Sequence, residues 1–258
     1  MIIRVSKDSL EMSHIMSLIN KECSAIVIEN FIPKETIQYL LERIINSPLK
    51  NSHSLASQFK KIGPAYTEVS TEEQRKTYHD ESIFHINRFR KIASPYISPI
   101  DELRLVLEEK WLGGARLLQD DSSKFFVGTC RYLEKNVELK PHTDQLFRNI
   151  NKESNIIINE QLAAITYLSM PRDGGELETW QQYPTPGEYE SLKGDSIYGI
   201  DRDMLPPARV KYKPIPGEMV IINSNEIHAV RPSMDIERIS LGCWIGYQDK
   251  NKPLVYWS

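Results

Sequence analysis

PGEMVIINSNEIH, residues 216–228, is the stretch of sequence that decides the fold. It contains a Pro-Gly turn, a short apolar run, a polar bend and a histidine that opens the next apolar run. Short apolar runs separated by turn residues are typical of an all-β sandwich or barrel. The stretch therefore predicts two strands joined by a bend that ends at His228.

The same pattern of short apolar runs extends over the whole second half of the chain, from Lys124 onward. Many residues in these runs are β-branched or aromatic, and Gly, Pro and Asn separate the runs. We predict a jelly roll, with a long surface connection at 184–216. The expected strands are 125–133, 162–168, 176–180, 208–212, 218–222, 228–231 and 238–247.

The first third of the chain instead shows helical periodicity. In residues 32–45, a proline stands where a helix can begin, and apolar residues recur at helical spacing. Residues 101–111 repeat the pattern, and residues 71–90 form a weaker candidate that is broken at 78–81. We expect one domain over 1–258, mainly helical at 1–122, with a jelly-roll core at 123–250.

Composition limits the classes of function. Of 258 residues, 40% are hydrophobic and the formal net charge is -3, so the balance of charge favours neither a nucleic acid nor an anionic membrane as partner. The three cysteines do not form a disulfide framework, and neither a secretory leader nor a membrane span is expected. We expect a cytoplasmic protein with a small-molecule substrate, and the oligomeric state stays open.

The motif KPHTD, residues 140–144, places His142 and Asp144 two positions apart. On an extended strand such side chains point to the same side, so both can reach one metal ion. With His228 they would form two imidazoles and a carboxylate, the facial set that holds non-haem Fe(II). Each residue also has a simpler interpretation, because His142 and Asp144 suit a solvated turn and His228 suits a core position.

Arg238 lies in ERISLGCW, residues 237–244, at the start of an apolar strand. A guanidinium there is costly unless it faces an anion, and its planar fork matches a carboxylate. The arginine therefore predicts an anionic co-substrate near the metal.

Taken together, these residues resemble the Fe(II)/2-oxoglutarate-dependent oxygenase superfamily over about residues 124–247. The order His-x-Asp, distal His and Arg-x-Ser carries the resemblance, with Gly174-Gly175 at a hairpin. It implies a double-stranded β-helix in which His142, Asp144 and His228 hold the iron. It further implies that 2-oxoglutarate and O2 are co-substrates, with 2-oxoglutarate held by Arg238 and Ser240, and that Tyr132 and Tyr167 stand against 2-oxoglutarate.

The helical N-terminal part is most similar to the small-molecule branch that includes standalone aliphatic halogenases and hydroxylases. Halogenases of this branch have Gly or Ala in place of the carboxylate ligand, whereas this chain keeps Asp144. The resemblance therefore implies hydroxylation of an unactivated C–H bond, with release of succinate and CO2.

Two other functions remain open. A hydroxylase of peptides or proteins, of the prolyl-hydroxylase type, would need an open groove, and a non-enzymatic binding module would leave Arg238 without a purpose. Other side chains are weaker candidates for the pocket: the loop 149–160 as a lid, Arg148 as a grip for a substrate anion, and an aromatic wall of Trp180, Tyr183 and Tyr198.

Overall fold

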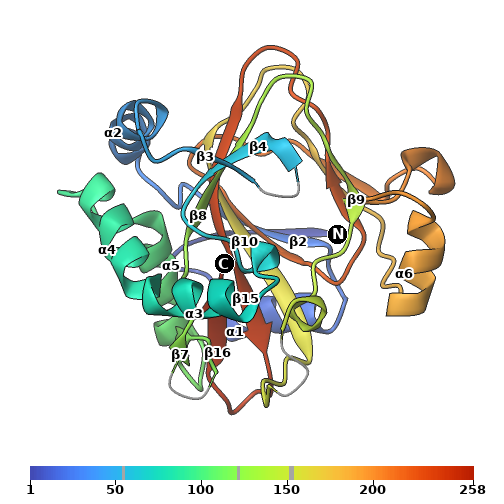
Figure 1. Cartoon of the computed structure of the whole chain (residues 1–258), viewed down its shortest axis with the longest axis horizontal. Coiled ribbons are helices and arrows are strands. Elements are labelled where there is room, and N and C mark those ends of the chain that lie inside the picture. The colour runs from blue at the N-terminus through green and yellow to red at the C-terminus, as the bar shows by residue number, and fades with distance from the viewer. Residues whose placement is uncertain (54–55, 121–122, 151–153) are drawn as a thin grey trace.

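The computed structural model describes residues 1–53, 56–120, 123–150 and 154–258. Two mainly antiparallel sheets face each other in these residues, and helices cover the outside (Figure 1). The main sheet has ten strands: β1 (Ile2–Ser6), β2 (Ala25–Glu29), β3 (Asn51–His53), β4 (Ala56–Ile62), β5 (Ala115–Leu117), β8 (Thr129–Leu133), β10 (Glu160–Ser169), β13 (Met219–Asn223), β15 (Arg238–Tyr247) and β16 (Leu254–Trp257).

The second sheet has four strands in the order β12-β11-β14-β9. Their bounds are β9 (Leu139–His142), β11 (Leu177–Thr179), β12 (Val210–Tyr212) and β14 (His228–Val230). In the main sheet, the neighbouring strands β8-β15-β10-β13 lie opposite these four. The two sets of four strands form the two sheets of a jelly roll, so the predicted fold is confirmed. A short pair, β6 (Gln119–Asp120) and β7 (Ser123–Lys124), stands apart.

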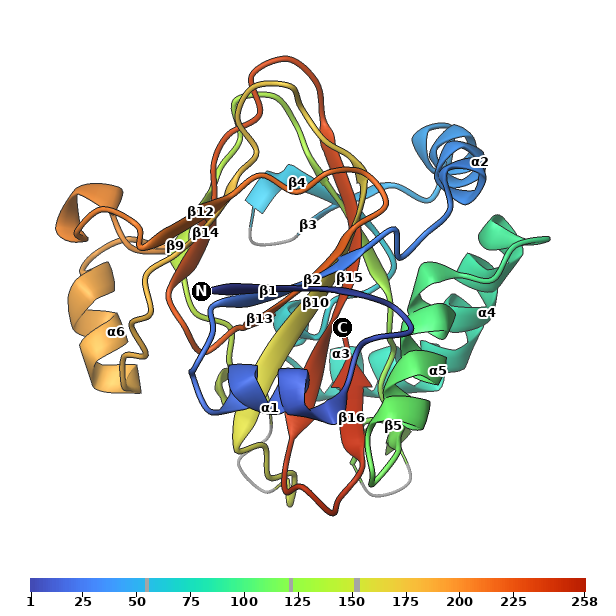
Figure 2. The same cartoon turned by 180° about the vertical axis from the view of Figure 1, so that it is seen from behind.

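The helices pack mainly against the outer face of the main sheet. α1 (Met12–Ile19), α2 (Lys34–Ile45) and α5 (Pro99–Lys110) contact β10 or β15, with α3 (Glu72–Asp80) and α4 (Ser82–Ala93) beside them (Figure 2). Short 3-10 turns are η1 (Tyr66–Glu68), η2 (Leu146–Arg148) and η3 (Arg202–Met204). No helix in the described part of the chain is long and apolar enough to cross a bilayer.

The predicted helices correspond to α2, α5 and the pair α3 and α4, which meet at Glu81 inside the expected break. Residues 1–122, expected to be mainly helical, also supply strands β1 to β5 to the main sheet, and the helical periodicity does not predict them. The long connection at 184–216 contains a helix, α6 (Pro186–Lys193), with Pro186 in its first turn and a capping box from Thr185. α6 lies on the side of the molecule opposite to α3–α5 (Figure 1).

Candidate active site

A cluster of side chains that could hold a metal ion lies at one end of the second sheet. His142 is the last residue of β9 and His228 the first of β14, and the two are direct partners in the antiparallel register. Direct cross-strand partners have neighbouring side chains, and the two imidazole rings lie 4.4 Å apart between centroids. Asp144 follows two residues after His142, and nitrogen or oxygen atoms of all three side chains lie within 4.8 Å of one another.

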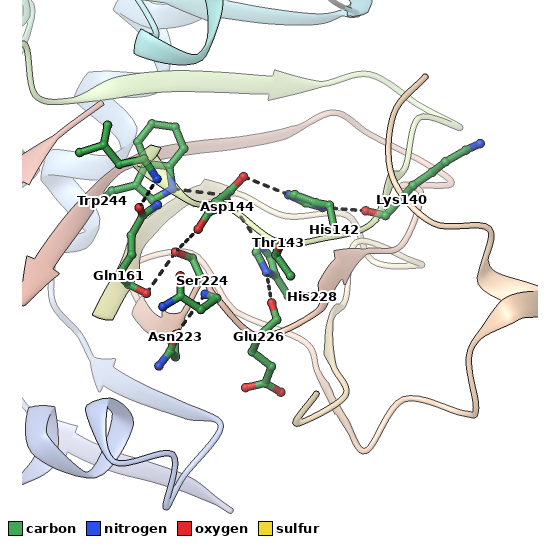
Figure 3. Close-up of polar contacts among 12 residues, drawn as sticks. Lys140, His142, Thr143, Asp144, Gln161, Asn223, Ser224, Glu226, His228 and Trp244 are labelled. Atoms are coloured by element: carbon green, nitrogen blue, oxygen red, sulfur yellow. Dashed lines mark hydrogen bonds and ion pairs between the residues drawn. The ribbon is translucent and has the colours of Figure 1, made fainter. Parts of the chain in front are cut away.

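The two histidines are oriented by backbone carbonyls. Nδ1 of His142 donates to the Lys140 carbonyl at 2.7 Å, and Nδ1 of His228 donates to the Glu226 carbonyl at 2.8 Å (Figure 3). A proton on Nδ1 leaves Nε2 of each ring as the free donor of an electron pair. Both Nε2 atoms lie 3.7 Å from oxygens of Asp144, as expected for three ligands that surround one position.

Asp144 is fixed from several sides. Its backbone N–H donates to the Ser224 carbonyl at 2.8 Å, and the Ser224 hydroxyl donates to its carbonyl at 3.2 Å. The indole Nε1 of Trp244, on β15, donates to Oδ2 at 3.3 Å (Figure 3). The carboxylate is therefore held in place before any metal binds.

The protonation states suit a cation site. Burial, together with the adjacent His228, lowers the pKa of His142 to about 4, so this imidazole is neutral at pH 7. Burial acts to raise the pKa of Asp144, but His142, His228 and Arg131 outweigh it and hold the pKa well below its usual range. Burial alone would lower the pKa of His228, whereas its contact with the Asp144 carboxylate raises it overall. A divalent cation would replace the proton shared in this cluster.

A candidate anion site lies further along β15. Arg238, Ser240, Gly242 and Trp244 occupy alternate positions of this strand, so their side chains share the face that looks into the sandwich. Tyr167 of β10 is the direct partner of Ser240, and the Arg238 guanidinium lies 4.9 Å from the centre of its ring. The side chains of Arg238, Ser240 and Tyr167 are all buried.

Two buried polar atoms of this anion site have no protein partner. Nε of Arg238 and the hydroxyl of Tyr167 form no hydrogen bond with any described residue. Leaving a buried donor without a partner is costly, and a guanidinium more so. A carboxylate bound between Arg238 and Tyr167 would satisfy both atoms, so the site fits a dicarboxylate that reaches from the metal to Arg238.

Arg131 also lines the cavity, although its place in the sequence does not single it out as a site residue. It is the partner of Ser240 across β8 and β15, and its guanidinium lies 5.2 Å from the Trp244 ring. Burial lowers its pKa, while Asp144 opposes that effect. Gly242 lies beside it, and a Cβ at this position would be only 2.9 Å from the Ala164 carbonyl oxygen of the neighbouring strand, although its distance of 3.5 Å from an Arg131 nitrogen would be an ordinary contact.

Tyr132 requires a correction. Its partner on β15 is Ile239, so its side chain lies on the face opposite to Arg238 and Ser240. Its hydroxyl donates to the Ile44 carbonyl of α2 at 2.7 Å, which fixes the ring outside the sandwich. The expected contact between the Tyr132 side chain and a co-substrate is therefore wrong, and the adjacent Arg131 faces the cavity instead.

One cavity of about 380 Å³ joins the metal cluster and the anion site. Its walls include Leu139, Ile165, Leu177, Ile222 and Val230, so most of its surface is apolar. Its polar lining includes the triad, Arg131, Arg148 and Arg238. A concave apolar cavity with a few convergent polar groups is the usual form of a small-molecule site.

The expected aromatic wall is present only in part. Tyr198 lines the cavity with its ring 5.5 Å from that of His142, and Phe59 lies 6.1 Å from Tyr198. Trp180 instead donates to the Pro206 carbonyl, and the Tyr183 hydroxyl donates to Glu226. Neither of those two lines the cavity. Within the loop expected as a lid, residues 151–153 lie outside the described residues.

Comparisons with known proteins agree with this architecture. The family model of the carrier-protein-independent halogenase WelO5 matches residues 2–258. No protein with a curated description is similar enough in sequence to be matched.

Several solved structures share the fold at low sequence identity. An N-substituted L-amino acid dioxygenase from Burkholderia ambifaria AMMD is 15% identical with a TM-score of 0.62, and the match covers 96% of this chain and 92% of that one. Its complex with alpha-KG matches at 16% identity and a TM-score of 0.61, over 95% and 90% of the two chains. HygX from Streptomyces hygroscopicus, with nickel and 2-oxoglutarate bound, matches at 12% identity and a TM-score of 0.50, over 92% and 87%.

Proposed function

The chain belongs to the family of the carrier-protein-independent halogenase WelO5, within the 2-oxoglutarate-dependent non-haem iron oxygenases, and we propose that it hydroxylates an unactivated C–H bond of a small molecule. The observation that carries this proposal is the buried carboxylate of Asp144, held between two histidines in the same cavity as Arg238.

Fe(II) would be held by Nε2 of His142 and His228 and by the carboxylate of Asp144. Two imidazoles and one carboxylate on one side of the ion leave the other side open for a co-substrate and O2. The carbonyls of Lys140 and Glu226 keep both imidazoles in the tautomer that can bind a metal. The indole of Trp244 keeps the carboxylate turned toward the same point.

2-Oxoglutarate would be held at its far carboxylate by Arg238, Ser240 and Tyr167. The unpartnered Nε of Arg238 and hydroxyl of Tyr167 are the support for this role. When iron and 2-oxoglutarate are bound, they supply the oxidation of a C–H bond by O2, with succinate and CO2 as by-products. The protein's own tasks are to place the substrate carbon near the metal and to exclude water, which the apolar walls of the cavity favour.

Hydroxylation is proposed over halogenation because of Asp144. A halide needs a coordination position of its own, and in this chain a carboxylate oxygen is aimed at that position by Trp244 and the Ser224 backbone contact. A small molecule is proposed over a peptide because the cavity of about 380 Å³ is at the lower end of small-molecule sites. A peptide hydroxylase would instead present an extended groove.

The test uses the protein with Fe(II) and 2-oxoglutarate under anaerobic conditions. We expect a visible metal-to-ligand charge-transfer band that is absent without either component and absent in His228→Ala. In air, a succinate-release screen with product mass spectrometry should then find a product one oxygen atom heavier than its substrate. A product that carries chlorine in the presence of chloride would overturn the proposed reaction.

A further inference from the structure

Arg148 stands at the mouth of the cavity with its guanidinium held in a fixed position. Nη1 donates to the carbonyl of Thr143 and Nη2 to its hydroxyl, each at 2.9 Å. Thr143 lies between the proposed ligands His142 and Asp144, so the guanidinium is tied to the loop that would hold the metal. The ring of Tyr189, on α6, packs against the guanidinium, with the ring centre 4.3 Å from the guanidinium carbon.

The remaining N–H groups of Arg148 have no anionic partner. No carboxylate among the described residues lies within ion-pair distance of Arg148. Glu190, next to Tyr189, pairs instead with Lys193 at 2.7 Å. A guanidinium that is held in place but lacks an anion is suited to binding one.

The other basic residues that line the cavity are already engaged. Lys61 is paired with Glu68 at 2.9 Å and donates to the Gly63 carbonyl, and Lys60 pairs with Glu134. Arg131 lies over Trp244, and Arg238 is assigned to the far carboxylate of the co-substrate. Fe(II) and 2-oxoglutarate carry equal and opposite charges, so their binding would leave the positive charge at the mouth uncompensated.

We propose that Arg148 binds a carboxylate of the substrate, and that the substrate of this enzyme is therefore an anionic small molecule with an apolar body. This assignment rests on the proposed function, because it places the apolar body over the proposed iron. Tyr198 and Phe59 supply aromatic parts of the cavity wall, and Leu139 and Val230 supply aliphatic parts. The carboxylate would fix one end of the substrate, which leaves a carbon of the apolar body facing the triad.

The test compares matched pairs of probes on the complex with Fe(II) and 2-oxoglutarate. The probes are 3-phenylpropionate, indole-3-propionate, N-acetyl-L-leucine and N-acetyl-L-phenylalanine, each with its primary amide. Binding is measured anaerobically from the change that each probe produces in the charge-transfer band. We expect at least one carboxylate to bind about 10- to 100-fold more tightly than its amide, as a charge-assisted contact requires.

The variants separate a binding role from a structural one. Arg148→Gln should reduce the carboxylate's affinity to that of the amide while leaving the amide's affinity unchanged, and Arg148→Lys should restore part of the difference. Arg172→Gln is the matched control, because the Arg172 side chain is 97% exposed, contacts Asp235 and does not line the cavity. Higher salt should reduce the advantage of the carboxylate in the parent protein.

Three results would overturn the assignment: no carboxylate of the panel changes the spectrum, carboxylates and amides bind equally, or Arg148→Gln weakens both members of a pair to the same extent. The parent protein and Arg148→Gln must both form the charge-transfer band with Fe(II) and 2-oxoglutarate before any probe is added. Loss of that band in the parent protein would instead contradict the proposed cofactors, so the two failures can be distinguished.

Discussion

At the scale of single residues, the proposed recognition of the co-substrate can be tested one side chain at a time. Arg238→Ala should weaken 2-oxoglutarate binding by roughly 100-fold or more, because it removes one member of a buried charge pair. Tyr167→Phe, which removes only the unpartnered hydroxyl, should weaken it by about 10-fold. Titration of the anaerobic Fe(II) protein with 2-oxoglutarate measures both. Full affinity in Arg238→Ala would exclude this arginine from the anion site.

The contact between Trp244 and Asp144 allows a second prediction at this scale. Trp244→Phe removes the indole N–H that donates to Oδ2 of Asp144, so the carboxylate becomes less well oriented. We expect metal affinity to fall by about 10-fold, as measured by competition of Fe(II) or Co(II) against a chelating dye. Trp111→Phe is the control, because it also loses one indole hydrogen bond, to the Lys252 carbonyl, away from the metal. Equal losses in the two variants would contradict the orienting role.

Residue types and spacing predicted His142, Asp144, His228 and Arg238, and the family resemblance added Ser240 and Tyr167. The structure brings these six residues to one cavity, most of whose other lining residues were not predicted. Trp244 was recoverable, since it lies six residues after Arg238 and strand alternation places both on one face. Arg131 and Tyr132 could not be assigned in this way, because alternation says that they face opposite sides without saying which one faces inward.

At the scale of elements, the helix α5 begins at a charged cluster that makes its stability depend on pH. Arg90 donates to both oxygens of Asp101 at 2.8 Å, and Arg104 lies 2.7 Å away. Burial acts to raise the pKa of Asp101, but these guanidinium groups and Ser98 lower it overall. Their stabilising contribution is therefore present above the ordinary carboxyl pKa and is lost as the pH falls through the lowered one.

Asp101→Asn should consequently be less stable than the parent protein by about 1–2 kcal/mol at pH 7. The difference should begin to shrink as the pH falls below about 4, where the carboxyl of the unfolded chain takes up a proton, and the charge-dependent part should be lost below the lowered pKa of the folded protein. Urea denaturation at pH 7, 5 and 3.5 measures the difference. A gap that does not change with pH would show that charge at Asp101 is not its source.

A second charged cluster connects the segment after α6 to the second sheet. Glu178 of β11 is almost fully buried and pairs with Arg202 and with Arg231, and Arg202 also reaches Glu138 of the loop before β9 at 3.2 Å. Arg202 stands four residues after Tyr198, which lines the cavity. The cluster therefore holds the segment that carries one wall of the site.

Arg202→Ala should reduce the free energy of unfolding by about 1–3 kcal/mol, because the buried Glu178 loses one of its two guanidinium partners. It should also make proteolysis between residues 194 and 209 faster. Lys193→Ala, which breaks a more exposed ion pair with Glu190, should change stability by less than about 1 kcal/mol. Similar losses in the two variants would argue against an anchoring role for the Glu178 cluster.

Elements were predictable where one periodicity dominated. The strand expected at 238–247 matches β15, and the proline that opens 32–45 stands at the N-cap of α2. Strand β4, with the sequence ASQFKKI, was missed because two lysines interrupt its apolar pattern, although Lys61 bends back to Glu68 and the Gly63 carbonyl. Strands β1 and β2 are parallel neighbours whose pairing joins residues 2–6 to 25–29, and no local pattern reports such a contact.

For the whole molecule, the site joins the two sheets of the jelly roll. The proposed metal ligands belong to the second sheet and to the loop that follows β9, whereas Arg238, Ser240 and Tyr167 belong to the main sheet. A metal alone would therefore bind one sheet, and a dicarboxylate bound to that metal would connect it with the other. Ligands that bind only the folded chain stabilise it according to their concentration and affinity.

Thermal unfolding should reveal this connection in two steps. A redox-inert metal such as Ni²⁺ at about 100 times its dissociation constant should add about 2.7 kcal/mol, or roughly 5–10 °C for a chain of this size. Adding 2-oxoglutarate should raise the midpoint further, because the bound dicarboxylate would also engage Arg238. In Arg238→Ala the increment from the metal should persist while the increment from 2-oxoglutarate disappears, and in His142→Ala both should disappear. An increment from 2-oxoglutarate without metal that equals the one with metal would mean that the two sites act independently, and that the co-substrate does not bridge the two sheets.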